Sequence, residues 1–343
     1  MDKIRQLNWG ILGAARVNER LLPAIINAPN ARLVAIASRR AGAAKATLEK
    51  YAPSYSADVC CYDDLNSLID DANVEAIYCP MANEEHAAWA LKAINAGKHI
   101  LIEKPMTTTV EDIEAIAQAA INNKVKVMEG FMYRFHPQHA RIQAMIDAGL
   151  IGDVLSARAS FSFLMQPARI YRINRSMADG GGAMWDIGPY AIHALRWCFA
   201  QNGKPAQPVA VVAQAKFNEH GADIVSSGVL DFGADAQGRA RFGHFDISFE
   251  RSRKSEYEII GTLGWIKCHA AWVFEQDHPV ISWALEDGRC GEERLAASNH
   301  FILEIAHFSD CVLNDKAPLL NTDDAKQNCL AIQSVLQSIA SAK

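Results

Sequence analysis

The 343-residue sequence predicts an α/β protein of two domains, a doubly wound parallel sheet followed by an α+β domain with a mostly antiparallel, open sheet. Three observations predict this fold class. The length corresponds to roughly two domains of ordinary size. Short apolar runs alternate with amphipathic helical patterns through the first 130 residues. After about residue 150, strand patterns follow one another with only turns between them.

Composition excludes several classes of protein. Half of the residues are hydrophobic, and 34 Lys and Arg stand against 39 Asp and Glu, for a net charge of -5. A disordered chain would carry fewer large apolar residues, and a nucleic-acid binder would carry a basic excess to meet the phosphates. No apolar run approaches the roughly 20 residues that span a bilayer, and the N-terminus lacks the apolar stretch of a secretory signal. We therefore expect a cytoplasmic protein with no nucleic-acid or membrane partner.

The eight cysteines predict neither a disulfide framework nor a zinc site. Cys60 and Cys61 are adjacent, and the other six are scattered through apolar or helical contexts with no C-x-x-C pair. His136 and His139 have the spacing of a metal pair, but no further ligand lies near them in the sequence. We expect reduced, mostly buried thiols and no metal.

The first domain, residues 1–130, alternates apolar runs with segments that carry apolar residues at helical spacing. The expected strands are 8–13, 33–38, 74–80, 99–103 and 125–129, and the expected helices are 17–27, 41–51, 84–96 and 110–123. This alternation implies a parallel sheet with right-handed crossovers and helices on both faces. Such sheets bind ligands beyond the carboxyl ends of their strands.

The second domain, residues 131–343, has successive strand patterns separated by turn signals such as Gly233 and Gly238. The expected strands are 154–164, 209–217, 224–232, 239–249, 257–260 and 265–269, and the expected helices are 183–200, 301–313 and 323–340. Short connections between consecutive strands imply a largely antiparallel sheet. The two C-terminal helices can pack back on the first domain.

This second sheet has too few helices to cover both of its faces. An open face carrying Phe242, Phe245, Trp265 and Trp272 would suit a twofold contact between identical chains. We therefore expect a homodimer or a higher homo-oligomer.

The turn after the first strand, GILGAAR at residues 10–16, approximates the dinucleotide fingerprint G-x-G-x-x-G/A. Small side chains there let backbone N–H groups approach a pyrophosphate at a helix N-terminus. The turn follows the first strand of an alternating α/β chain, so we interpret the first domain as a Rossmann dinucleotide-binding domain. The expected cofactor-binding residues of this turn are Gly13, Ala14, Ala15 and Arg16.

The end of the second strand indicates which dinucleotide is bound. An NAD site normally has an Asp or Glu here for the ribose hydroxyls. This chain has Ser38, Arg39 and Arg40 instead, and we expect no acidic residue in reach of them. A guanidinium pairs bidentately with a 2'-phosphate, and a hydroxyl hydrogen-bonds it. The sequence predicts NADP, with NAD the less favoured cofactor.

Three separated motifs resemble those of the glucose-fructose oxidoreductase/inositol dehydrogenase (Gfo/Idh/MocA) family. They are GILGAA at 10–15, Glu103-Lys104-Pro105, and GGGAMWDIGPY at 180–190. The segment MEGFMYRF at 128–135 looks most like the dihydrodiol dehydrogenase and D-xylose dehydrogenase branch. The resemblance implies hydride transfer between a nicotinamide and a hydroxyl-bearing carbon of a sugar or cyclic polyol.

The resemblance also implies roles for residues. Lys104 inherits the position that acts at the reacting oxygen, and a proline after it rigidifies the turn, with a cis bond one way to do so. The loop after the fourth strand would contact the cofactor. The residues implied there and at the E-K-P motif are Pro80, Asn83, His86, Glu103 and Lys104.

The third motif implies substrate contacts. Asp186 and Tyr190 are four residues apart and would share one helix face, with His193 one turn further. Many family members have D-x-x-x-H where this chain has Tyr190, so either Lys104 or Tyr190 is the principal proton donor. The expected catalytic residues are Lys104, Asp186 and Tyr190, and Arg169 and His193 would join them in contacting a sugar or polyol substrate.

Two other functions fit the same motifs. One is a glycosidase that oxidises and re-reduces its substrate with a tightly held cofactor, and the other is a non-catalytic dinucleotide-binding regulator. Arg39 and Arg40 weigh against the first, because the relatives in question hold NAD. Lys104, Asp186 and Tyr190 together weigh against the second, since a sensor needs no proton-transfer groups.

Overall fold

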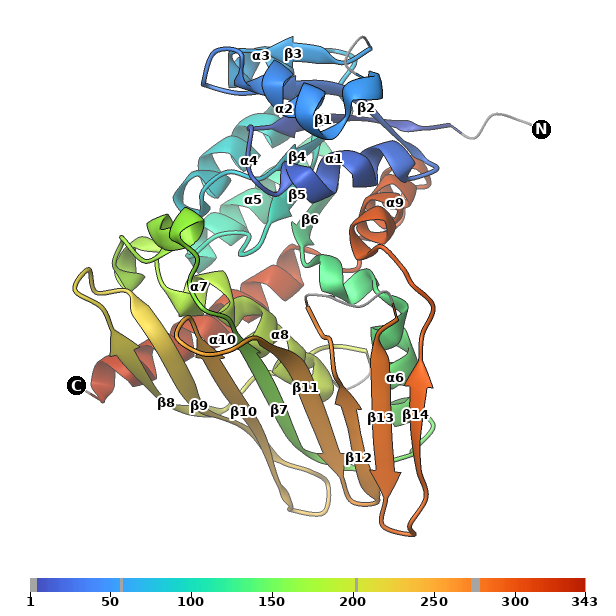
Figure 1. The fold of residues 1–343 in the computed structure, drawn as a ribbon, viewed down its shortest axis with the longest axis vertical. Coiled ribbons are helices and arrows are strands. Elements are labelled where there is room, and N and C mark those ends of the chain that lie inside the picture. Colours follow the sequence, from blue (N-terminus) through green and yellow to red (C-terminus); the bar gives the residue numbers. More distant parts are fainter. Residues whose placement is uncertain (1–4, 56–57, 201–202, 273–277, 343) are drawn as a thin grey trace. The chain divides into compact units, whose positions relative to one another are not determined.

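The computed structural model describes residues 5–55, 58–200, 203–272 and 278–342, and the chain forms two compact units (Figure 1). The first contains the described residues through Phe135 together with Asn299–Lys326, and the second contains those of His136–Ser298 and Gln327–Lys343. The sequence division at residue 130 therefore falls close to the first boundary between units. Residues 299–326 return to the first unit, although the sequence division assigned them to the second domain.

The first unit is built on a six-stranded parallel sheet of order β3-β2-β1-β4-β5-β6. Its strands are β1 (Leu7–Leu12), β2 (Ala31–Ala37), β3 (Cys60–Tyr62), β4 (Ala76–Cys79), β5 (His99–Glu103) and β6 (Val127–Gly130). Its helices are α1 (Asn18–Asn27), α2 (Ala43–Tyr51), α3 (Leu65–Asp70), α4 (His86–Asn95), α5 (Val110–Asn123) and α9 (His300–Leu313). The predicted doubly wound parallel sheet is confirmed.

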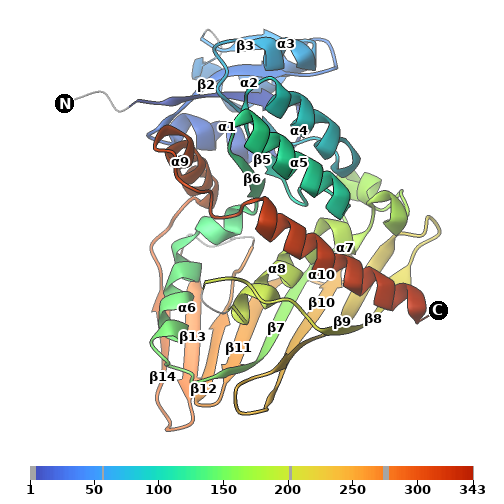
Figure 2. The same cartoon turned by 180° about the vertical axis from the view of Figure 1, so that it is seen from behind.

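Helices cover this sheet on both faces. α1 and α9 pack together on one face, and α4 and α5 pack together on the other, as Figures 1 and 2 show from opposite sides. Two short elements, β3 and α3, were not predicted, because three to six residues carry too little periodicity to be recognised. α3 nevertheless has a capping signal, since Asp64 accepts a hydrogen bond from the Ser67 N–H.

The second unit is built on an eight-stranded sheet of order β14-β13-β12-β11-β7-β10-β9-β8. Its strands are β7 (Val154–Ser162), β8 (Ala210–Phe217), β9 (Asp223–Ala234), β10 (Ala240–Ser248), β11 (Lys254–Gly261), β12 (Gly264–Cys268), β13 (Val280–Leu285) and β14 (Cys290–Arg294). β7 and β10 pair in parallel, and the other neighbours pair antiparallel. The mostly antiparallel sheet is confirmed, and β13 and β14 were not predicted.

The helices of the second unit lie on one face of its sheet. They are α6 (Pro137–Asp147), α7 (Ala183–Asp186), α8 (Gly188–Cys198) and the part of α10 (Thr322–Ser341) that follows Lys326. Figure 2 shows α6, α8 and α10 in front of the sheet, and Figure 1 shows its open face. The expected helix 183–200 is wrong as one element, because a one-residue turn at Ile187 (φ -116°, ψ -20°) separates α7 from α8, which begins at Gly188 and Pro189.

Strand alternation decides which side chains face the helices. Along β10, Gly243, Phe245 and Ile247 are buried, whereas Phe242, which precedes them, is exposed. Phe245 and Trp272 are buried in the core, so their predicted place on the open face is wrong. A period of two assigns neighbouring residues to opposite faces, but the sequence alone does not say which face is covered.

Five of the eight cysteines are buried, in agreement with the expectation of mostly buried thiols. All eight cysteines are free, and only Cys60, Cys61 and Cys290 are exposed. Across the described ranges, no helix has the length and apolar character needed to cross a membrane.

Candidate active site

The turn between β1 and α1 is fixed by its neighbours. Gly13 has φ +130°, a conformation that favours glycine, and its N–H donates to the Ala37 carbonyl at the end of β2 over 2.9 Å. The buried Asn18 at the start of α1 donates from Nδ2 to the Gly13 carbonyl over 2.9 Å. The turn thus has the tight path that a pyrophosphate requires, with the small side chains of Ala14 and Ala15 following it.

The end of β2 carries the predicted phosphate-reading residues. The Arg40 N–H donates to the buried Ser38 Oγ at 3.1 Å, and Arg40 Nη2 donates to the Ala14 carbonyl at 3.1 Å. These contacts join the loops after β1 and β2, where the adenosine ribose of a dinucleotide lies in a Rossmann domain.

Arg39 has an acidic partner that the sequence analysis missed. Its guanidinium binds Glu85 bidentately, with Nη1–Oε1 and Nη2–Oε2 distances of 2.6 and 3.0 Å. The statement that no acid is in reach is therefore wrong. Glu85 is 46 positions further along the chain, in the loop after β4, and only the folded sheet, in which β1 separates β2 from β4, brings it to Arg39.

Lys104 lies in a turn that buried side chains hold from several directions. The Lys104–Pro105 peptide is cis, as the sequence analysis anticipated. Glu103 accepts a close hydrogen bond from the Tyr78 hydroxyl and one from the Lys104 N–H at 3.2 Å. The buried Glu129 accepts from the Met106 N–H at 2.7 Å. The backbone on both sides of Lys104 is therefore fixed.

His86 contributes to the same turn. Its ring is fully buried, with Nδ1 2.8 Å from the Pro105 carbonyl and Nε2 2.9 Å from the Met81 carbonyl. Burial lowers the pKa of His86, and its contacts with the Pro105 and Met81 carbonyls act in the opposite direction. Both nitrogens face backbone carbonyls, so the ring bridges the loop after β4 and the Lys104 turn. Pro80 and Asn83 belong to that loop, Pro80 directly after β4 and Asn83 at its 3-10 turn.

A second buried acid lies near Glu103. Glu304, on α9, is fully buried, and no partner for its Oε1 is found among the described residues. Burial, with a smaller contribution from the negative charge of Glu103, raises the pKa of Glu304 well above its ordinary value. The sequence analysis missed Glu304, since an acid among the apolar residues of a C-terminal helix gives no sign of its neighbours.

Asp186 ends α7 in the second unit and forms an ion pair with Arg172 Nη1. The Asp186 side chain is 10% exposed and that of Arg172 is 35% exposed, so the pair is reached by solvent from the arginine side. The turn at Ile187 places Asp186 at the end of α7 and Tyr190 in α8, so the single helix expected to carry both residues is two helices.

Tyr190 lies in α8 among aromatic side chains. Its ring centroid is 5.6 Å from that of Phe161 and 6.1 Å from that of Trp272. His193, one turn further along α8, is also buried. Arg169 lies in a 3-10 turn with its guanidinium 5.1 Å from the Phe163 ring centroid. The second unit therefore holds Asp186, Tyr190, His193 and Arg169, and the first holds Lys104 and the expected cofactor residues.

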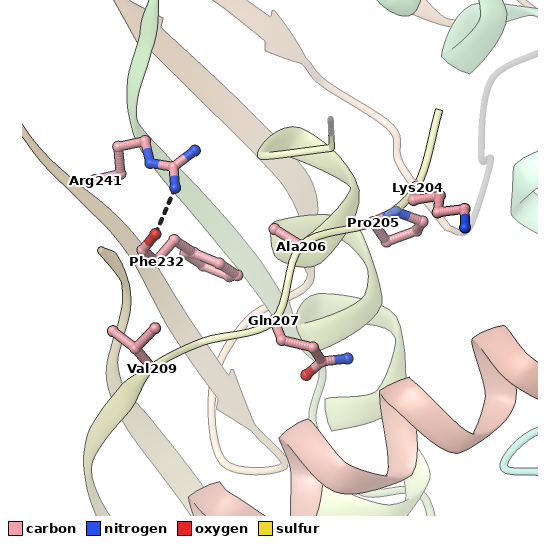
Figure 3. Close-up of a pocket in the computed structure, with 7 residues that line it drawn as sticks. All are labelled: Lys204, Pro205, Ala206, Gln207, Val209, Phe232 and Arg241. Carbon is pink, nitrogen blue, oxygen red and sulfur yellow. Dashed lines mark hydrogen bonds between the residues drawn. The ribbon is translucent and has the colours of Figure 1, made fainter. Parts of the chain in front are cut away.

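Two further features lie outside these sites. His139 is a core residue whose Nδ1 is 2.7 Å from the Tyr257 hydroxyl, and in the described part of the chain no three His, Cys, Asp or Glu residues are grouped to hold a metal ion. A pocket in the second unit lies beside Phe232 and Arg241, whose Nη2 donates to the Phe232 carbonyl at 2.6 Å (Figure 3). None of its seven lining residues is a predicted site residue.

Two family models match the chain in the order of its two sheets. Residues 7–131 match the oxidoreductase family with an NAD-binding Rossmann fold, and residues 139–267 match the GFO/IDH/MocA C-terminal domain. The chain belongs to the GFO/IDH/MocA oxidoreductase family. The resemblance seen in the sequence motifs is confirmed.

Relatives in this family act on sugars and diols. The chain is 27% identical to the D-xylose 1-dehydrogenase (NADP(+)) 2 of Haloferax volcanii over 96% of both chains. It is 29% identical to the trans-1,2-dihydrobenzene-1,2-diol dehydrogenase of Xenopus tropicalis over 67% of this chain and 66% of that protein. Among solved structures, a 3-ketoreductase from Actinomadura kijaniata in complex with NADP and TDP-benzene aligns with a TM-score of 0.85 and 27% identity over 98% of both chains.

Proposed function

We propose that the protein is an NADP-dependent oxidoreductase that transfers hydride between the nicotinamide and a hydroxyl or carbonyl carbon of a sugar, polyol or dihydrodiol, with Lys104 as the acid/base. The observation that carries the proposal is the Lys104 turn, whose backbone is held by Tyr78 through Glu103, by Glu129 and by His86. A surface lysine needs no such support, whereas a proton-transfer group must be held in one geometry.

The chemistry asks for one proton transfer for each hydride transfer. A bound nicotinamide accepts or donates the hydride. In oxidation, Lys104 Nζ takes the proton from the substrate hydroxyl, which requires a neutral amine. In reduction, the Lys104 ammonium donates the proton and stabilises the developing alkoxide. Asp186 and Tyr190 hold substrate hydroxyls, with the Arg172 guanidinium paired to the Asp186 carboxylate, and Arg169 and His193 belong to the same substrate-binding set.

The residues present fit NADP. Gly13, Ala14, Ala15 and Arg16 would hold the pyrophosphate. Pro80 and Asn83 in the loop after β4, with Glu103 at the end of β5, would border the nicotinamide half. Ser38, Arg39 and Arg40 would bind the 2'-phosphate. The Arg39–Glu85 pair does not oppose this role, because the Arg39 side chain is 59% exposed and exposed pairs contribute little. A dianionic phosphate therefore competes with the Glu85 carboxylate for Arg39.

Arg39 also gives a test of cofactor choice. Arg39→Ala should weaken NADP binding by about 1.5–3 kcal/mol, as for a lost charge-assisted contact, and leave NAD binding unchanged. Glu85→Gln should strengthen NADP binding slightly, since it frees the guanidinium. Titration calorimetry with both cofactors measures these effects, and equal weakening of both cofactors by Arg39→Ala would contradict the assignment.

The reaction itself is tested by a substrate screen. Purified protein is mixed with NADP or NAD and with aldoses, polyols, keto-sugars and dihydrodiols, and absorbance of the reduced cofactor is followed in both directions. We expect turnover with NADP on at least one of these classes. Tight cofactor binding without turnover on any class would contradict the proposal and favour a regulator.

We also propose that the protein forms a homodimer through the open face of the eight-stranded sheet. Val212 and Phe242 are exposed on that face, and Trp265 is half-buried there. Light scattering at micromolar concentration should give twice the mass of the chain, and Phe242→Asp should give the monomer. Ile121→Asp, at an apolar residue of α5 that is more exposed than Phe242 (70% against 38%), is the control and should leave the mass unchanged.

We place the protein in the cytoplasm. All eight thiols are free in the structure, including the adjacent and exposed pair Cys60 and Cys61. Free thiols in this number are typical of a reducing compartment. Fractionation of cells that produce the protein, followed by immunodetection, checks the assignment.

A further inference from the structure

The segment that carries Asp186 is held by a residue that the motifs do not include. α7 begins after Gly182, and a glycine has no side chain with which to cap the first turn of a helix. The cap comes instead from Asp223, the first residue of β9 and 39 positions away. Its Oδ2 accepts from the Met184 N–H at 2.9 Å and from the Ser226 hydroxyl at 2.6 Å.

The glycine run makes room for this contact. Gly182 has φ +96°, and a Cβ there would lie 2.0 Å from Asp223 Oδ1. A Cβ on Gly181 would lie 2.4 Å from the Arg175 carbonyl oxygen. A side chain at position 182 would clash with Asp223, and one at position 181 would clash with the backbone of Arg175, so both glycines are needed for the chain to pass this close to its neighbours.

The same hairpin holds the other partner of the ion pair. Between β8 and β9, Asn218 Nδ2 donates to the Ile173 carbonyl at 2.7 Å, next to Arg172. The Gly182 N–H donates to the Arg172 carbonyl at 2.8 Å. The hairpin therefore sets the backbone at both Arg172 and α7, which are the two supports of the Arg172–Asp186 pair.

We infer that Asp223 is a positioning residue for the reaction, acting through α7 to place the Asp186 carboxylate toward substrate, an inference that rests on the proposed function. Asp223 is fully buried, and its contacts are to the protein itself, so it acts on the geometry of Asp186 and on no substrate atom. Burial raises its pKa to about 6, so it is mostly a carboxylate at neutral pH. A negative charge at this place stabilises the N-terminus of α7.

Four variants test the inference. Asp223→Ala removes both acceptor oxygens, Asp223→Asn keeps one acceptor oxygen for the Met184 N–H, and Ser226→Ala removes only one hydrogen bond. Ser248→Ala is the matched control, a fully buried serine on β10 whose Oγ accepts from the Glu250 N–H. For each variant we would measure kcat, KM, the NADPH dissociation constant, the melting temperature and amide hydrogen exchange of residues 183–187.

Asp223→Ala should lower kcat/KM by roughly 10- to 100-fold, the range for a catalytic group displaced by a fraction of an ångström to 1 Å. In this variant the NADPH affinity should stay within about twofold of wild type, and amide hydrogen exchange at residues 183–187 should become faster. Asp223→Asn should recover most of the lost kcat/KM. Ser226→Ala should reduce kcat/KM by a few-fold and Ser248→Ala should not.

Wild-type kinetics in folded Asp223→Ala would overturn the inference, as would an Asn variant as poor as the Ala variant. If Asp223→Ala does not fold, Ser226→Ala against Ser248→Ala decides, and equal kinetics in those two overturn it. Failure of the proposed function is distinguishable, because it shows as a wild-type protein without turnover. In that case the exchange of residues 183–187 still reports whether Asp223 holds α7.

Discussion

Lys104 in the first unit and Asp186 in the second are both held by neighbouring elements, but the holding contacts differ in kind. The Lys104 turn is fixed by backbone hydrogen bonds to Glu103, Glu129 and His86, two of which are fully buried. Asp186 is fixed by a partly exposed ion pair with Arg172 and by a helix cap from a distant strand. The first arrangement tolerates changes in solvent, and the second depends on charges that solvent reaches.

The largest effect is expected at Lys104. Lys104→Met should lower turnover by roughly 10²–10⁴, the range for losing a positioned proton-transfer group, and should leave NADP affinity nearly intact. Because the turn is held through backbone atoms and other side chains, the substitution should not move it. Single-turnover and steady-state kinetics on the best substrate measure the loss. Near-normal turnover would refute Lys104 as the acid/base.

Tyr190→Phe sharpens the comparison between the two units. If Lys104 is the principal proton donor, removing the phenol should cost only about tenfold, as for one hydrogen bond to substrate. The ring should stay in place because Phe161 and Trp272 pack against it. A collapse in rate comparable to that of Lys104→Met would instead make the Tyr190 hydroxyl the donor.

Arg172→Ala tests the exposed ion pair of the second unit. Loss of the guanidinium leaves the buried Asp186 carboxylate without this partner, and we expect kcat/KM to fall by about tenfold. Arg239→Ala is a closely matched control. The side chains of Arg239 and Asp235 are 36% and 11% exposed, against 35% and 10% for Arg172 and Asp186. Equal kinetics in the two variants would show that the Arg172 pair has no role in the reaction.

A smaller effect, on stability, is expected at Glu304 in the first unit. Its folded-state pKa lies well above the ordinary 4.5, so its stabilising contribution is fully present below about that pH and is lost as pH rises through the folded pKa. Glu304→Gln cannot ionise and should be more stable than wild type at pH 8, with the gap closing toward pH 4.5. Urea unfolding at several pH values measures this.

Asp310→Asn, on the same helix, should have the opposite effect on stability, so this variant should be less stable than wild type at pH 8. Its bonds to Lys316 and Asn314 lower the pKa of Asp310, so ionisation favours the folded state. That contribution is present above pH 3.8 and is lost as pH falls through the lower folded pKa.

A Glu304→Gln variant that is no more stable than wild type at pH 8 would show that Glu304 is ionised at no cost in the fold.

The sequence predicted much of each unit, and the elements that it missed depend on tertiary packing. Strands 8–13 and 33–38 match β1 and β2 within one or two residues, because a buried parallel strand is an unbroken apolar run. The helix expected at 183–200 is two helices, because propensity and spacing do not register a break that tertiary packing makes favourable. Strands β13 and β14 went unrecognised, because strand propensity depends on the neighbours against which a strand packs.

The sequence by itself determined the fold class, the family motifs and the place of the Lys104–Pro105 turn, because each is encoded in residues that are neighbours along the chain. Only the tertiary structure decided which distant residues contact Arg39 and helix α7. Glu85 reaches Arg39 across 46 positions, and Asp223 caps α7 from 39 positions away. The physical reason is that charge and hydrogen-bond interactions depend on distance in space and not on distance along the chain. Parallel crossovers and long hairpins bring together residues that are far apart in the sequence, and nothing in the sequence near either residue indicates the contact.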